Sequence, residues 1–327
     1  MKNKGVKIAL IASGSALVLG GILLGAGVSL GGSPSFYLDE QGLHVKENTQ
    51  IVPKENYAME ATKTGAVRKL TLNLVDADVQ IVSGDEWSVE YELDGQRLEP
   101  VYRFEDGELT LEEGEYDYSG QSAASFEIGG RWWQNVSSGS CDPHVKITVP
   151  DGGSLEEVSI DTRYGDVEIE RNLRAKTARI DAKDGSVRMD GWNGDELELN
   201  LEYGSLTAGE LNGANVTVDN ENGAIRIGAL KVDTADLRME YGELTADVER
   251  AKSVDVENEN GNVTLYLVGG VDSFGVNLHT DYGMIRTPEG TVRSDDYDGS
   301  SDYIRAEGDA AAVRVYTDYG DIRIREK

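Results

Sequence analysis

Residues 197–227 read LELNLEYGSLTAGELNGANVTVDNENGAIRI and contain one structural unit twice. In each copy apolar residues alternate with polar ones, a turn residue and a glycine follow, and a second alternating run begins two residues after the glycine. Alternation with a period of two is typical of a β-strand with one buried face. The stretch therefore predicts short strands joined by tight turns at Tyr203-Gly204 and Asn222-Gly223.

The same unit recurs through residues 151–327, and its glycines are separated by 20, 19, 19, 19, 19, 22 and 37 residues. They are Gly165, Gly185, Gly204, Gly223, Gly242, Gly261, Gly283 and Gly320. The positions seven and five residues before each glycine, and two after it, are apolar in every copy. We expect these three columns to form the core, and we expect the glycines to occupy turn positions with positive φ.

A repeat of this length predicts an all-β fold, a right-handed parallel β-solenoid with coils of 19 residues. Like positions of successive coils would then stack about 4.8 Å apart. An antiparallel meander or a propeller is the alternative, because Asn-Gly and Asp-Gly pairs are also typical of hairpin turns. The short repeat and its constant register favour the parallel solenoid.

The repeats leave a less regular region on their N-terminal side. Residues 65–150 alternate in several places, and we interpret them as N-terminal coils and a cap with an aromatic loop insertion between Glu112 and Pro143. Residues 151–327 form the regular repeats, with an insertion near Pro288–Asp302 and an extra strand at residues 303–305. We expect the final strand, at residues 321–325, to be the outer edge, protected by the charges of Glu326 and Lys327.

The N-terminal segment has the pattern of a membrane anchor. Lys2, Lys4 and Lys7 precede 23 uncharged residues, 8–30, which as a helix would span about 34 Å and cross a hydrocarbon core of about 30 Å. We therefore predict a single-pass protein of the cell membrane, with residues 1–7 cytoplasmic, 8–30 spanning, 31–64 a juxtamembrane stalk and the rest extracytoplasmic. A cleaved signal peptide is the competing interpretation, although its apolar region is normally shorter.

The charge of the chain limits its partners. The net charge is −29, and because the first 35 residues carry three lysines and no acids, the rest carries −29 − 3 = −32. Such a surface repels nucleic acid and anionic lipid headgroups. It leaves cations and basic peptides as partners, or a role of the charge in solubility alone. The chain has one cysteine, Cys141, so it has no internal disulfide framework.

Several copies of the unit resemble a known group of proteins. The segments DTRYGDVEIE (161–170), DNENGAIRIGAL (219–230), ENENGNVTLYL (257–267) and VRVYTDYGDIRIREK (313–327) are similar to repeats of the bacterial putative-adhesin domain of unknown function, a β-strand-repeat family. The resemblance covers residues 65–327. It implies a β-solenoid, membrane-anchored in bacteria, and it brings no catalytic residues with it.

Acidic residues recur two positions before the glycines, at Glu202, Glu221, Glu240, Glu259 and Asp281. Stacked coils would place these carboxylates in one row about 4.8 Å apart. Bound calcium, which favours oxygen ligands, would relieve their repulsion, and so would a basic ligand. The alternative is a solvated face that keeps the protein soluble. No EF-hand spacing supports a dedicated calcium site, and no other cofactor is expected.

Aromatic residues provide the candidate ligand-binding positions. Tyrosine occupies the turn position before five of the glycines, at Tyr164, Tyr203, Tyr241, Tyr282 and Tyr319. In chain order it recurs about every second coil, and we take Tyr203, Tyr241 and Tyr282 as candidates for stacking on a sugar or a peptide side chain. Trp132 and Trp133, in the loop before Pro143, are a second candidate anchor. The alternatives are packing over the turn glycines for the tyrosines and capping of the solenoid for the loop.

The sequence gives little support for catalysis. The histidines, His44, His144 and His279, are too dispersed to indicate a metal site or a triad, and Cys141 near His144 has no third partner. We predict a non-enzymatic adhesion, binding or envelope scaffold protein whose ligand is a surface glycan or protein. The alternatives are a sensory envelope protein that signals through a membrane partner, and a polysaccharide lyase or hydrolase that uses the acidic row.

Overall fold

The computed structural model describes residues 55–95, 97–115, 142–293, 299–305 and 312–327, and the backbone of three further short strands. The chain divides into two compact units, Met1–Lys54 with Tyr116–Ser140, and Glu55–Glu115 with Cys141–Lys327. The predicted spanning segment 8–30 and the Trp132-Trp133 loop lie outside the described residues. Within the described part, no helix is long and apolar enough to cross a membrane.

The smaller unit contains an antiparallel sheet that the sequence did not predict. Its strands are β2 (Gly42–Val45), β1 (Ser35–Asp39) and β9 (Ala124–Glu127), in that order. Two of them lie in the predicted stalk and the third in the predicted loop. β1 and β2 form a local hairpin, whereas β9 joins β1 from a distant part of the chain, with Ser35 paired with Glu127, and leaves no local pattern to detect.

The larger unit is all-β, as predicted, and its strands form one long sheet. The strands are β3 (Tyr57–Lys63), β4 (Lys69–Leu74), β5 (Asp78–Gly84), β6 (Ser88–Leu93), β7 (Val101–Glu105), β8 (Glu108–Glu112), β10 (His144–Pro150), β11 (Leu155–Thr162), β12 (Val167–Ala182), β13 (Val187–Tyr203), β14 (Leu206–Asn222), β15 (Ile225–Tyr241), β16 (Leu244–Arg250), β17 (Ser253–Asn260), β18 (Val263–Leu267), β19 (Val276–Tyr282), β20 (Ile285–Thr287), β21 (Gly290–Val292), β22 (Ser301–Ile304), β23 (Val313–Tyr319) and β24 (Ile322–Glu326), and the short helix α2 (Val271–Phe274) follows β18.

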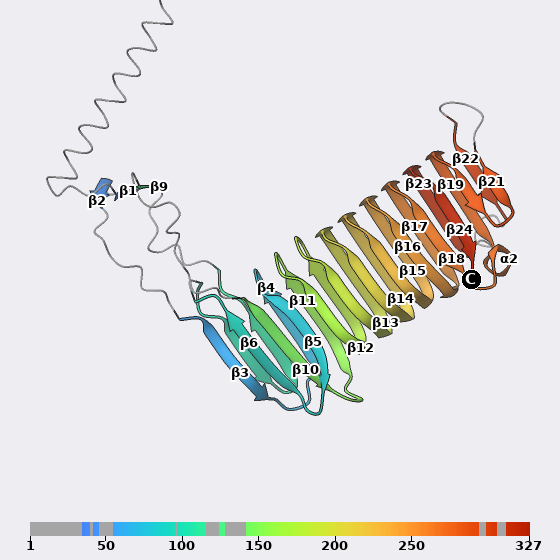
Figure 1. Ribbon diagram of the computed structural model, residues 1–327. Helices are drawn as coiled ribbons and strands as arrows, with labels where there is room; N and C mark the ends of the chain where they lie inside the picture. The colour runs from blue at the N-terminus through green and yellow to red at the C-terminus, as the bar shows by residue number, and fades with distance from the viewer. Residues whose placement is uncertain are drawn as a thin grey trace, which may run out of the picture. The chain divides into compact units, whose positions relative to one another are not determined.

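Successive coils pair in parallel. Strands β12 to β15 each lie beside the next, and Leu197 of β13 is paired with Val216 of β14, which is paired with Ala235 of β15, each 19 residues further on. Figure 1 shows these strands side by side along the larger unit. The parallel stack is therefore confirmed against an antiparallel meander, whereas the winding sense stays a prediction.

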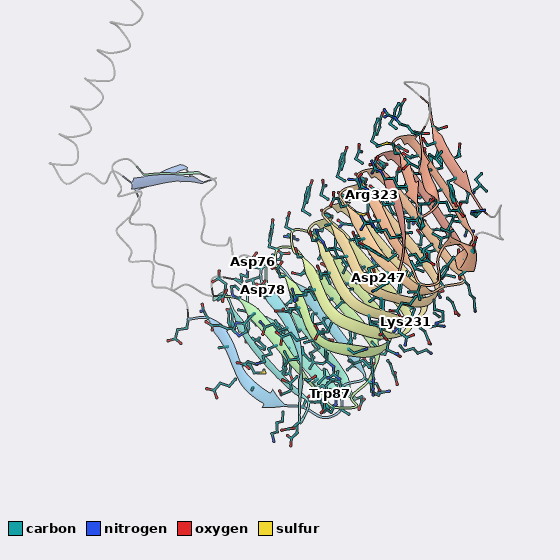
Figure 2. All side chains as sticks on the ribbon, turned by 45° about the vertical axis from the view of Figure 1, so that its right-hand side comes forward. Asp76, Asp78, Trp87, Lys231, Asp247 and Arg323 are labelled. Carbon is teal, nitrogen blue, oxygen red and sulfur yellow. The ribbon has the colours of Figure 1, made fainter. Side chains whose placement is uncertain are left out.

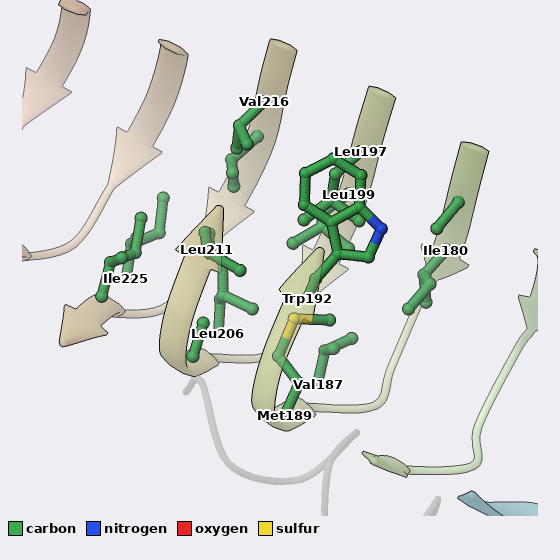
Figure 3. Packing of buried hydrophobic residues seen from close by; sticks show 14 of the residues in the cluster. Ile180, Val187, Met189, Trp192, Leu197, Leu199, Leu206, Leu211, Val216 and Ile225 are labelled. Carbon is green, nitrogen blue, oxygen red and sulfur yellow. The ribbon is translucent and has the colours of Figure 1, made fainter. Parts of the chain in front are cut away.

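The three apolar columns form the core. Val187, Leu206, Ile225, Leu244 and Val263, each two residues after a glycine, are at most 1% exposed. Between the columns Trp192 is fully buried, and its Nε1 donates to the carbonyl oxygen of Ala175 at 3.1 Å. Figure 3 shows its ring among the aliphatic side chains of this core. A side chain at Gly194 or Gly213 would collide with this ring, at 2.6 and 2.4 Å.

The turn glycines are required for a reason that differs from the predicted one. Only three of the eight, Gly223, Gly242 and Gly261, have a positive φ, of 149–152°. At every one of the eight, however, a Cβ atom would lie 1.7–2.1 Å from a backbone carbonyl oxygen of the neighbouring coil. We call this column the glycine ladder. Close approach of the backbones, more than turn conformation, excludes a side chain here.

The order of the coils in space differs from their order in the chain. β23 pairs with β17 on one side and β19 on the other, and β24 pairs with β18 and β20. The last coil of the sequence thus lies between the two coils that precede it, as Figure 1 shows. The prediction that the final strand is the outer edge is wrong. Antiparallel strands β22, beside β19, and β21, beside β20, cover that end instead.

The N-terminal end shows the same arrangement. β5 pairs in parallel with β10 and with β12, and β4 pairs with β8 and with β11. Antiparallel strands β3, β6 and β7 lie beyond them. β3 falls within the stretch predicted as stalk, yet it pairs with β6 of this sheet. Each end therefore finishes in strands that run against the stack.

Candidate functional site

The turn before each ladder glycine presents a row of tyrosines at one edge of the coils. Tyr164, Tyr203, Tyr241, Tyr319 and Tyr282 are each 48–57% exposed. We call these five residues the tyrosine ridge. About half of each side chain is available to solvent, which leaves ring surface accessible to a ligand.

Tyrosine and asparagine alternate along most of the ridge, but two tyrosines are neighbours at its end. The paired residues run Tyr203, Asn222, Tyr241, Asn260, Tyr319 and Tyr282 across successive coils. The rings of Tyr319 and Tyr282 lie 4.8 Å apart at an angle of 6° and are stacked. The expected recurrence at about every second coil therefore holds from Tyr203 to Tyr319 and is wrong for Tyr282, which lies on the coil next to Tyr319.

Buried polar side chains support the carbonyl groups of the glycine ladder. Three residues before the ladder glycines, Asn220 donates to the carbonyl of Gly204 at 3.3 Å, and Asn258 donates to that of Gly242 at 3.1 Å. Thr280 donates to the carbonyl of Gly320 at 2.9 Å. These residues are at most 1% exposed. Because buried polar groups hold their geometry through such bonds, the ridge stands on a fixed backbone.

The acidic row exists, and it has a further member, Asp318, two residues before Gly320. In space it runs Glu202, Glu221, Glu240, Glu259, Asp318 and Asp281. Glu202 pairs with Lys183 at 2.9 Å. Glu221, Glu240 and Glu259 form no ion pair with any residue that the structure describes. Within that part of the chain, no group of three or more acidic, histidine or cysteine side chains is arranged to hold a metal ion.

A groove of about 260 Å³ lies next to the stacked end of the ridge, over β17, β23 and β19. Its lining includes His279 and Tyr316, whose rings are stacked 5.1 Å apart at 5°. Tyr316 donates to Asp281 Oδ2 at 3.0 Å, and the Nε2 atom of His279 lies 2.9 Å from Oδ1 of the same carboxylate. Nδ1 of His279 lies 2.7 Å from Asp302 on the antiparallel strand β22.

Sequence reasoning missed this cluster. Asp302 is 23 residues away from His279 in the chain, and Tyr316 belongs to the inserted coil. The available signal was local, because His279 and Asp281 are two residues apart and so share one face of a strand. The structure places His279, one of the three histidines that are dispersed in the sequence, beside Asp281 and Asp302.

The charge state of His279 follows from its two carboxylate partners. Hydrogen bonding to Asp302, and secondly to Asp281, raises the pKa of His279 above its ordinary value of 6.5. The same contact with His279 lowers the pKa of Asp281. Hydrogen bonds to Asp318 and Asp281 raise the pKa of Tyr316, so this phenol stays protonated. The imidazolium thus links β19 to the covering strand β22.

We predict that His279 titrates above pH 6.5 and that Asp302→Asn lowers this midpoint. A raised folded-state pKa means that the contact stabilises the fold below the unfolded pKa, and that this contribution is lost as pH rises through the folded pKa. An NMR titration of the His279 ring protons in the full-length chain measures both midpoints. A midpoint at or below 6.5, or one that Asp302→Asn leaves unchanged, would contradict the assignment.

The parallel stack with a glycine ladder and an aromatic edge defines a protein of the β-strand-repeat class. Residues 67–325 match the Toastrack DUF4097 family, and the chain belongs to this family. The resemblance to the putative-adhesin family is thereby confirmed. No curated protein sequence matches the chain.

The solved structures that are similar to the chain include three putative adhesion proteins. A putative adhesin from Bacteroides fragilis is 12% identical, with 84% of this chain and 98% of that chain covered and a TM-score of 0.40. A putative adhesin from Parabacteroides distasonis is 12% identical, with 84% and 97% covered and a TM-score of 0.45. A putative cell adhesion protein from Clostridium sporogenes is 15% identical, with 84% and 100% covered and a TM-score of 0.23.

Proposed function

We propose that this protein is a non-catalytic adhesion or scaffold protein of the bacterial envelope that binds a surface glycan or protein through the tyrosine ridge. The carrying observation is the row of half-exposed tyrosines held on a rigid stack. Tyrosine offers a large amphipathic contact surface and loses little side-chain entropy on binding, because it has only two rotatable torsions. A regular row of such rings suits an extended ligand with repeated contacts.

The neighbouring charges restrict that ligand. The acidic row lies one residue before the ridge along each strand, so an anionic ligand would be repelled and a neutral glycan or a basic protein segment is favoured. Calcium bound by the row would weaken this preference. A ligand that fits these charges therefore makes its main contacts with the tyrosine rings, and the carboxylates provide additional contacts.

The proposal includes the location of the protein. The apolar segment 8–30 would anchor the chain in the cell membrane, with the N-terminus cytoplasmic and the repeats outside. The charge distribution supports this arrangement, because three lysines precede the segment and the repeats are strongly acidic. The ridge would then face the surroundings of the cell.

Bacterial attachment tests the role of the ridge. We expect cells that carry the triple variant Tyr203→Ala/Tyr241→Ala/Tyr319→Ala to attach to matrix-coated surfaces about tenfold less than wild type, since a few aromatic anchors provide most of the energy of an interface. The matched control replaces the same residues by Phe, which keeps the rings. Attachment should then be retained. Surface levels of each full-length variant are measured in parallel.

Two outcomes would count against adhesion through the ridge. Wild-type attachment by the alanine variant, at equal surface level, would remove the ridge from the function. Unchanged attachment together with co-purification of a membrane protein that depends on residues 8–30 would favour the sensory role instead.

A further inference from the structure

A second groove, of about 410 Å³, lies over β20 and β24, in the two coils that carry the stacked tyrosines. Its lining residues are Arg286, Thr287, Pro288, Arg323, Ile324, Arg325 and Glu326. Arg323, labelled in Figure 2, lies on the strand that follows ladder residue Gly320. Three arginines in one groove stand out in a protein whose net charge is −29.

The inserted last coil brings these arginines together. Arg286 of β20 is paired directly with Arg323 of β24, although they are 37 residues apart in the chain. Like charges on paired residues of adjacent strands repel each other and destabilise the pair. One carboxylate, Asp321, offsets this repulsion, since its Oδ2 atom lies 2.7 Å from Arg286 Nη1 and 3.0 Å from Arg323 Nη2.

The third arginine has no acidic partner among the described residues. The guanidinium of Arg325 lies 5.8 Å from the ring centre of Tyr266, and within that part of the chain it forms no ion pair. The other carboxylate of the lining, Glu326, has its Oε1 atom directed at Gly270, where a Cβ would lie 2.9 Å away. Arg286 and Arg323 share Asp321, and Glu326 is the second carboxylate of the groove. Three guanidinium groups and two carboxylates leave net positive charge there.

We propose that this groove binds a small ligand of monosaccharide size that carries a carboxylate, sulfate or phosphate group. Guanidinium groups recognise such oxyanions through paired hydrogen bonds. Pro288, which is exposed, provides an apolar surface for the rest of the ligand. The volume falls in the range of small-molecule sites. A broad anionic surface is excluded, because the acidic remainder of the chain repels it at long range.

Calorimetric titration of the full-length chain in detergent tests the proposal, with glucose 6-phosphate and glucuronate as probes and glucose as the neutral comparison. We expect both anionic sugars to bind and glucose not to bind. Arg325→Gln should weaken binding about tenfold or more, because it removes a charge-assisted contact. This variant removes no ion pair of the described residues, so it should fold normally.

Arg226→Gln is the matched control. Arg226 is paired with Thr245, which is paired with Thr264 and then Arg323, so it lies on the same face three coils from the groove. It removes the same charge and should leave the affinity unchanged. Inorganic phosphate, as a further probe, separates the contribution of the oxyanion from that of the sugar ring. If phosphate binds more weakly than glucose 6-phosphate, part of the affinity comes from the sugar.

Three results would overturn the proposal. The first is no binding of glucose 6-phosphate, glucuronate or phosphate at millimolar concentration. The second is an affinity that Arg325→Gln does not change. The third is an equal loss from Arg226→Gln, which would mean that the ligand senses only the overall charge of the face.

Discussion

Gly242→Ala should destabilise the stack by about 3 kcal/mol or more, because the new methyl group has no room. A Cβ at this position would lie 1.8 Å from the carbonyl oxygen of Gly223 and 3.0 Å from the terminal methyl carbon of Met239. The first neighbour is backbone, so it can move only if the coils separate. Urea unfolding of the full-length chain, followed by circular dichroism, measures the shift.

Gly290→Ala is the matched control for this prediction. Gly290 has nearly the same φ as Gly242, 155° against 149°, but nothing lies within 4 Å of the place that its Cβ would take. Both substitutions place alanine at a similar positive φ, so the difference between them reports mainly the collision with the neighbouring coil. Equal effects of the two substitutions would show that backbone conformation, and not close approach, explains the glycine ladder.

Glu113→Gln should destabilise the N-terminal coils by about 3 kcal/mol, because it breaks a buried ion pair. The side chains of Glu113 and Arg97 are each 1% exposed, and Glu113 Oε1 lies 3.1 Å from Arg97 Nε. The other oxygen accepts the backbone N–H groups of Val75 at 2.7 Å and Asp76 at 3.0 Å. An amide in place of the carboxylate would leave the guanidinium with less compensating charge.

The neighbouring residue provides the control. Glu112 is exposed on β8, and Glu112→Gln should change the unfolding free energy by less than about 0.5 kcal/mol. A Glu113→Gln effect as small as that of Glu112→Gln would show that the buried pair contributes nothing to the fold.

The sequence predicted the parts of the fold that depend on local pattern. Period-two alternation indicated the strands, and the constant spacing of glycines indicated the parallel register that pairs Leu197 with Val216. The three apolar columns are the core because a coil of fixed length returns the same positions to the same face. Exposure of the tyrosines also follows from their place in the turn.

The order of the coils could not be predicted in the same way. Every coil carries the same columns, so the last coil fits equally well beside β17 or beyond β19, and the pattern does not distinguish the two. The place of Asp318 in the acidic row, the contact between Arg325 and Tyr266 and the pairing of β22 with β19 all depend on that order. The cluster around His279 was missed for the same reason.

Disulfide cross-linking tests this order of coils most directly. In a Cys141→Ser background, Thr264→Cys with Arg323→Cys should oxidise to an intramolecular disulfide, because the two residues are paired between β18 and β24. Thr264→Cys with Arg286→Cys should not, since two coils separate their backbones by about 9.6 Å. The opposite result would place the coils in chain order. It would remove the structural basis of the contact between Arg325 and Tyr266 in the arginine groove and of the contact between His279 and Asp302.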